Sequence, residues 1–378
     1  MGSDANARLP IKPRYGRLLN DFKTGDVYHH PWEVTIDDGL LAMFAASFPD
    51  PNPLYSSRRF ALDMGFRDRV VHPLALMNLA LSFSVHDVSE QSVAHLAYLS
   101  MKFPNPAYVG DTFSAFSRVI GGRVSKSQPA YGVVHVQTVG MNQDRQPVIS
   151  FERKALVPQG VLAGRAHPAP PPLKPDAPAL VASAPHFVVS AEVKSLPLEL
   201  TRPVKMPLWR GRPAGLFEDF KEGDIILHSV GRTVGESEHM QLATLFRNSH
   251  PLHTDEVYSR KRSFAGTRVV YGGLVFAWVA SLASRDTSAN ALWEMGFDNG
   301  AHPSPVLAGD TLYAASRVIE KREQGEQRGT VRFHLVGVKN ERPSALLKAG
   351  VDLFGDKFEA KVFEIERMVL LPRRSVVF

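Results

Sequence analysis

The spacing of apolar residues predicts one long buried helix in each half of the chain. Segments 72–85 and 271–284 are rich in Leu, Val and Ala and are apolar nearly all round. Neither contains Pro after its first turn, so each is typical of a helix enclosed by protein. Shorter segments, 40–48 and 239–246, carry apolar residues at helical spacing and predict a second helix in each half.

Long strands are predicted after each buried helix. Segments 131–142 and 330–340 alternate polar with apolar residues at period two, as strands in a sheet do. Segments 111–120 and 310–319 alternate as well, each behind a Gly-Asp turn. A long buried helix followed by long antiparallel strands predicts an α+β architecture, with a sheet wrapped around a helix.

The two halves repeat one another. The stretch PNPAYVGDTFSAFSRVIGGR begins at Pro104, and PSPVLAGDTLYAASRVIEKR begins 199 residues later at Pro303. The order of these and other landmarks indicates duplication of a unit of about 140 residues. We expect repeats at 12–160 and 211–378, joined by a Pro-rich linker at 161–210 that contains HPAPPPLKPDAPAL.

Composition narrows the class of protein. The chain has 378 residues, 44% of them apolar and 22% charged, which suits a globular protein of two domains. No apolar run approaches the ~18 residues of a membrane span. The absence of Cys excludes disulfides and thiolate chemistry, and fits a cytoplasmic protein.

The formal net charge is +6, but Lys and Arg are dispersed rather than gathered on one element. We therefore do not expect a nucleic-acid partner. Two local basic clusters, 58–69 and 260–268, have two interpretations. Each is either a solvent-exposed face or a site that binds the phosphates of a ligand.

One loop carries candidate chemistry. It reads DPNPLY at 50–55 in the first half and NSHPLH at 248–253 in the second, shortly before each buried helix. The chain resembles the MaoC-type (R)-enoyl-CoA hydratases, which carry Asp-x-Asn-Pro-x-His here and His-Gly at the helix start. Because the resemblance spans both halves, it implies a double hot-dog fold.

The second half is most similar to the mesaconyl-CoA hydratase (β-methylmalyl-CoA dehydratase) group. The matching segments are GESEHMQLATLFRN, RVVYGGLVFAWVASL, SPVLAGDTLYAASRVI and the terminal LLPRR. The resemblance implies reversible hydration of an enoyl-CoA, with the CoA thioester as substrate and no cofactor. It further suggests a branched or dicarboxylic acyl group.

The two halves differ where the chemistry is expected. In the family, Asp and His hold water while N–H groups at the helix start face the thioester oxygen. The first half has Tyr55 in place of the His and Pro73, which has no N–H, in place of the Gly. The second half has His253 followed by Gly272 and Gly273, so it is the predicted catalytic half.

Roles follow from this resemblance. His253 is the predicted acid/base. Asn248 replaces the family's Asp and, because an amide cannot ionise, is expected to orient water. Gly272 and Gly273 are the predicted oxyanion donors.

Three further residues are candidate substrate contacts. Tyr271 holds the family's His position, and its alternative interpretation is a packing residue. Arg247 and Arg268 are the two candidates to meet an acyl carboxylate. No metal site is expected, since the spacing of the nearby His residues does not favour one.

Two other functions remain open at the level of sequence. A thioesterase on this fold would need a carboxylate to drive water, and position 248 has none. A non-catalytic acyl-CoA-binding protein would bind ligand without turnover. A homo-oligomer is possible in every case.

Overall fold

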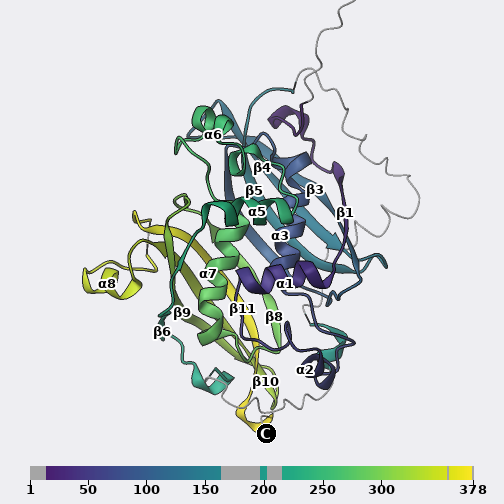
Figure 1. Ribbon diagram of the computed structural model, residues 1–378, viewed down its shortest axis with the longest axis vertical. Helices are drawn as coiled ribbons and strands as arrows, with labels where there is room; N and C mark the ends of the chain where they lie inside the picture. The colour runs from purple at the N-terminus through teal and green to yellow at the C-terminus, as the bar shows by residue number, and fades with distance from the viewer. Residues whose placement is uncertain (1–13, 163–195, 202–214, 356, 377–378) are drawn as a thin grey trace, which may run out of the picture.

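The computed structural model describes residues 14–162, 196–201, 215–355 and 357–376 (Figure 1). Two series of elements follow one another along the chain. The helices are α1 (Asp38–Ser47), α2 (Arg58–Asp63), α3 (Pro73–Phe83), α5 (Glu236–Leu245), α6 (Glu256–Arg262), α7 (Gly272–Thr287) and α8 (Pro343–Lys348). The strands are β1 (Val27–Thr35), β2 (Ala94–Lys102), β3 (Thr112–Val124), β4 (Tyr131–Met141), β5 (Pro147–Pro158), β6 (Ile225–Leu227), β7 (Arg232–Thr233), β8 (Trp293–Ala301), β9 (Thr311–Glu323), β10 (Arg328–Lys339) and β11 (Lys361–Pro372).

The described strands form one antiparallel sheet that runs through both halves. Its order is β1-β3-β4-β5-β2-β8-β11-β10-β9-β6, and β7 pairs with β9. The halves join where β2 pairs with β8, with Met101 opposite Phe297. At this seam Gly296 has φ 147°, and a Cβ there would lie 2.0 Å from the Met101 carbonyl oxygen. Only glycine permits so close an approach of the two strands.

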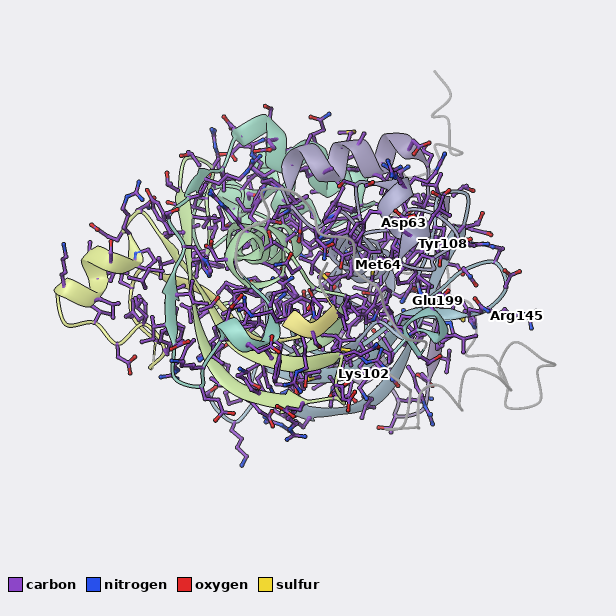
Figure 2. All side chains as sticks on the ribbon, turned by 90° about the horizontal axis from the view of Figure 1, so that it is seen from below. Asp63, Met64, Lys102, Tyr108, Arg145 and Glu199 are labelled. Carbon is purple, nitrogen blue, oxygen red and sulfur yellow. The ribbon has the colours of Figure 1, made fainter. Side chains whose placement is uncertain are left out.

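The sheet curves around the two long helices, as the end-on view in Figure 2 shows. Every residue of α3 is buried, and α7 is buried along most of its length. The predicted buried helices are α3 and α7, and the predicted shorter helices are α1 and α5. The predicted strands are β3, β4, β9 and β10. The predicted α+β architecture is confirmed.

The duplication extends to a buried hydrogen-bond network. In the first half, His30 Nδ1 lies 3.0 Å from Asp87 and His30 Nε2 lies 2.8 Å from Ser117 Oγ. In the second half, His228 joins Asp286 at 2.7 Å and Ser316 at 2.9 Å. Each of these two networks links a strand of the sheet to a residue at a helix end. Because the two serines are almost fully buried, neither network acts as a hydrolytic triad.

Most of the predicted linker lies outside the described residues. The piece that is described, Leu198–Thr201, forms a 3₁₀ turn with Leu200 fully buried. Arg328 donates to the Leu200 carbonyl. The Tyr108 hydroxyl donates to Glu199 at 3.3 Å, and Figure 2 labels these two residues. This piece is packed against the fold and is not a free spacer. The exact boundaries of the two repeats stay a prediction.

Glu90 links the halves. Its carboxylate accepts a hydrogen bond from the Ser249 hydroxyl, beside the NSHPLH loop. Burial raises the pKa of Glu90 from 4.5 to about 7, and the Ser249 hydrogen bond only partly opposes this. The folded protein therefore takes up a proton at this carboxyl between about pH 4.5 and 7.

Replacement of Glu90 by Gln is expected to make the protein's stability less dependent on pH. A raised folded-state pKa contributes stability below pH 4.5 that is lost as the pH rises through about 7. The variant should therefore melt several degrees above wild type at pH 8.5 and much closer to it at pH 5.5, as measured by thermal denaturation. Glu341→Gln, at an exposed glutamate, is the control. An equal shift at both pH values would contradict the assignment.

Candidate active site

A cavity of about 440 Å³ opens between the two halves. One wall comes from the end of α3, β2 and β5, and the other from the NSHPLH loop, the start of α7 and the segment after β8. Among the described residues, its lining includes two cations, Arg153 and Lys357, and no carboxylate. Its polar lining residues are Ser89, Ser92, His95, Tyr98, Arg153, Asn248, His250, His253, Tyr271, His302, Ser304 and Lys357.

His253 ends a 3₁₀ turn, Pro251–His253, and lines the cavity. Its Nδ1–H donates to the Val269 carbonyl at 2.8 Å, so Nε2 is left as the acceptor of the ring. Burial lowers its pKa to about 3, with a further contribution from His250. The imidazole is therefore neutral at pH 7, in the tautomer that a general base requires.

Asn248 lies beside it. Its Oδ1 accepts from the backbone N–H of His250 at 3.0 Å, which forms the turn of the loop. Its Nδ2 is buried, and the amide lies close enough to the Tyr271 hydroxyl to oppose the rise that burial causes in the pKa of that phenol. Asn248 and His253 both line the cavity, so the amide and the imidazole lie beside the same space.

The start of α7 supplies further donors. Counting from the start of α7, the first backbone N–H that donates a hydrogen bond is that of Leu274, which bonds the Tyr271 carbonyl at 2.9 Å. No hydrogen bond among the described residues engages the N–H of Gly272 or Gly273, and Tyr271 makes no side-chain cap. A helix start with free N–H groups and a positive dipole suits a developing oxyanion.

The two glycines differ in their surroundings. Gly272 lines the cavity, and a Cβ there would meet His302 Nε2 at 3.0 Å. Gly273 is buried, and a Cβ there would lie 2.4 Å from Asn78 Oδ1 and 2.6 Å from the Tyr271 ring. Side chains are thus excluded at Gly273 by packing as well as by any catalytic role.

The corresponding place in the first half is closed. Pro73 has no N–H, and the N–H of Leu74 is taken by His72 Nδ1 at 3.1 Å. The other ring nitrogen of His72 lies 3.3 Å from Asp50, and the Tyr55 ring packs 4.4 Å from the imidazole. Both backbone donors are therefore lost in the first half, one through Pro73 and one through a cap that the sequence did not reveal.

The three predicted substrate contacts have different locations. Tyr271 lines the cavity, and its hydroxyl accepts from Ser82 at 3.1 Å. Arg268 is ion-paired with Glu236 and Glu256, and exposed Arg247 donates to backbone carbonyls of its own turn. Neither arginine lines the cavity. The structure therefore does not support either as the partner of an acyl carboxylate, because proximity in sequence does not bring them to the cavity.

Most of the cavity lining was not predicted, and four residues of it bear on the chemistry: His95, Tyr98, Arg153 and His302. Burial lowers the pKa of His302 to about 4, and its Nε2 lies 3.4 Å from the Tyr98 hydroxyl. One of the four carried a signal in the sequence. Arg153 shares the inward-facing parity of Phe151 and Ala155 on β5, a charged residue at a core position.

The basic clusters show ordinary surface pairing. Arg58 pairs with Asp68 and Arg260 with Glu256. Phe264, between the arginines of the second cluster, is 72% exposed at the edge of the cavity. A role for these clusters in binding CoA phosphates stays a prediction. Within the described ranges there is no group of residues suited to a metal ion and no helix long and apolar enough to cross a membrane.

The chain belongs to the MaoC-like family of hydratases and dehydratases. A family model for mesaconyl-CoA hydratase matches residues 9–164, and one for the MaoC like domain matches residues 220–338. The fold and the family together define an enzyme of the hydratase/dehydratase class.

Similar proteins extend over the whole chain. A β-methylmalyl-CoA dehydratase from Chloroflexus aurantiacus is 31% identical over 97% of this chain and 100% of its own length. A mesaconyl-CoA hydratase from Cereibacter sphaeroides is 33% identical over 87% of this chain and 91% of its own.

Solved structures agree on the fold. A putative MaoC domain protein dehydratase from Chloroflexus aurantiacus superimposes with a TM-score of 0.76 at 28% identity, covering 99% of this chain and 100% of its own. A Mycobacterium tuberculosis protein with a double hot-dog fold gives 0.68 at 20% identity, covering 95% and 98%. The predicted double hot-dog fold is confirmed.

Proposed function

We propose that the cavity hydrates the double bond of an enoyl-CoA reversibly, and that mesaconyl-CoA is the substrate. The names of the relatives support this substrate. The arrangement that carries the proposal is the meeting of a neutral imidazole, a buried amide and a helix start with free N–H groups at one cavity of the predicted catalytic half.

In the hydration direction, His253 Nε2 takes a proton from a water that Asn248 orients, while the water oxygen bonds to the β-carbon. The electron pair of the C=C bond moves toward the thioester oxygen, which faces the N–H groups of Gly272 and Gly273. The imidazolium then returns its proton to the α-carbon. Burial, which lowers the pKa of the ring to about 3, favours this return of the proton and makes the ring a weaker base for the first transfer.

The two alternatives have less support. A thioesterase needs a carboxylate or comparable base to direct water at the thioester carbon, and the described cavity lining contains no carboxylate. A binding protein without activity would not need His253 held in a single tautomer. The family places the chain among enzymes, which disfavours the binding role.

Mesaconyl-CoA, crotonyl-CoA and butyryl-CoA are expected to separate these functions. A hydratase removes the conjugated enoyl absorbance of mesaconyl-CoA without releasing free CoA thiol, and leaves butyryl-CoA intact. The assay follows absorbance and thiol release in parallel, with the enzyme omitted as control. Thiol released from butyryl-CoA would identify a thioesterase, and tight binding without either signal would identify a binding protein.

A further inference from the structure

Arg153 is a buried cation without a carboxylate partner. It lies on β5 of the first half, is 2% exposed and lines the cavity of the second. Its guanidinium donates to Ser89 Oγ at 3.1 Å and Ser84 Oγ at 2.7 Å. Its Nε is buried with no partner, and no ion pair joins it to a carboxylate of the described residues.

The duplication provides an internal comparison. Arg367 on β11 occupies the same place in the second half, within IERMVLLP as Arg153 lies within FERKALVP. Arg367 forms a two-pronged ion pair with Glu294, with Nη2 and Nε 2.6 and 3.0 Å from Oε2. One arginine of the repeat is thus neutralised inside the protein, and the other is not.

The register shows what replaces the missing carboxylate. Glu294 lies opposite Val369 on β11, and His95 lies opposite Ala155 on β5. Since Val369 and Ala155 each follow the repeated arginine by two residues, His95 holds the position of Glu294. Both ring nitrogens of His95 are buried without a hydrogen-bond partner. In the first half, the neutral ring of His95 with an unused N–H donor therefore lies where the second half has the carboxylate of Glu294.

A buried cation in this setting requires a counter-charge. Burial lowers the pKa of Arg153 to about 10, yet the group stays charged at neutral pH. An unpaired charge in a low-dielectric interior is unfavourable, and a ligand anion that meets it gains a strong interaction. Burial raises the pKa of Tyr271 and the charge of Arg153 opposes this rise, so the guanidinium lies within electrostatic range of the α7 start.

We propose that Arg153 binds a carboxylate carried by the acyl chain of the substrate, with His95 as a second donor. The first half, which has lost its own catalytic groups, then selects dicarboxylic acyl-CoAs for the second half. The location of Arg153 near the start of α7 favours a short acyl chain, whose carboxylate lies close to the reacting double bond. This inference rests on the proposed function and assigns to the same site a residue that determines specificity.

Replacement of Arg153 by Met is expected to abolish the preference for a dicarboxylic substrate. The kcat/KM for mesaconyl-CoA should fall about 100-fold, as it does when one member of a buried charge pair is removed. The value for uncharged crotonyl-CoA should change less than about threefold by the same reasoning. Lys154→Met removes a cation from the next residue of β5, outside the cavity, and should leave both values unchanged. A fall of equal size for both substrates would overturn the proposal.

A binding measurement keeps the test independent of turnover. Wild type should bind succinyl-CoA more tightly than butyryl-CoA in calorimetry, and Arg153→Met should bind the two alike. If wild type hydrates neither enoyl-CoA, the proposed function fails and this binding difference alone decides the inference. Should the Met variant not fold, Arg153→Lys retains the charge without the planar fork, and its preference for succinyl-CoA should be intermediate. A preference unchanged in the folded variant would overturn the inference.

Discussion

Replacement of His253 by Ala is expected to lower kcat for hydration by about 10³- to 10⁴-fold, the upper part of the range for loss of a general acid/base. The reason is that the described cavity lining offers no carboxylate that could take over proton transfer. KM should change little, because the ring is proposed to act on water and on the α-carbon. Steady-state hydration of mesaconyl-CoA checks this result.

The pH profile gives a second readout for His253. With a pKa lowered to about 3 by burial, the ring stays in its base form above that value and is lost as a base only as the pH falls through it. The acid limb of kcat/KM for wild type should therefore be flat from about pH 8 to below pH 5. Asn248→Ala is expected to cost less than His253→Ala, since an amide only orients water.

Tyr55→Phe is the matched control for His253, because Tyr55 holds the equivalent position in the first half. It should leave kcat within about twofold, as expected for a residue outside the reacting groups. Undiminished activity in His253→Ala, or a large loss in Tyr55→Phe, would reverse the assignment of the catalytic half.

Replacement of Glu294 by Gln is expected to destabilise the protein by about 3–5 kcal/mol, the usual result of leaving one member of a buried ion pair alone. Arg367 is 3% exposed, and its guanidinium donates its two shortest hydrogen bonds to this carboxylate. Arginine cannot escape the penalty by losing its proton, so the uncompensated charge remains. Denaturant unfolding or thermal melting measures the loss.

The contrast with Arg153 makes this prediction specific. Arg153→Met removes a cation that has no anionic partner, so that variant should melt no lower than wild type. Arg367→Met should be destabilised, though less than Glu294→Gln, because the abandoned carboxyl can take up a proton. Burial already raises the pKa of Glu294. The double variant Glu294→Leu with Arg367→Met should recover most of the stability. Equal melting of Arg153→Met and Glu294→Gln would contradict the account.

Both predictions arise from one feature of the molecule, the divergence of two copies that keep the same backbone. In the first half, the corresponding place is occupied by Tyr55, His72 and Asp50, and the Glu294–Arg367 ion pair of the other half lies within electrostatic range of Tyr55 and Asp50. In the second half, the equivalent space is open, and the first half contributes one of its walls. Each site is therefore built from both repeats, and under the proposed function the first repeat is retained because it forms a wall of the second repeat's cavity.

The sequence by itself determined the duplication, the buried helices, several strands and the half that carries the proposed chemistry. These depend on local signals: periodicity of apolar residues, repeated turns, and the presence of Gly or Pro at a helix start. His253, Asn248, Gly272 and Tyr271 were predicted from the resemblance to the family's motif, and the structure places all four at one cavity. Gly273, predicted with them, is buried and is not part of the cavity lining.

Only the tertiary structure decided which charged residues line that cavity, namely Arg153 and Lys357. Arg247 and Arg268 are near the loop in sequence, yet their guanidinium groups bond to their own turn or to Glu236 and Glu256. Arg153 is far away in sequence and reaches the cavity because β5 and β2 of one repeat form a wall for the other. Strand pairing between the halves is a long-range property of the sheet, so no local pattern could reveal it.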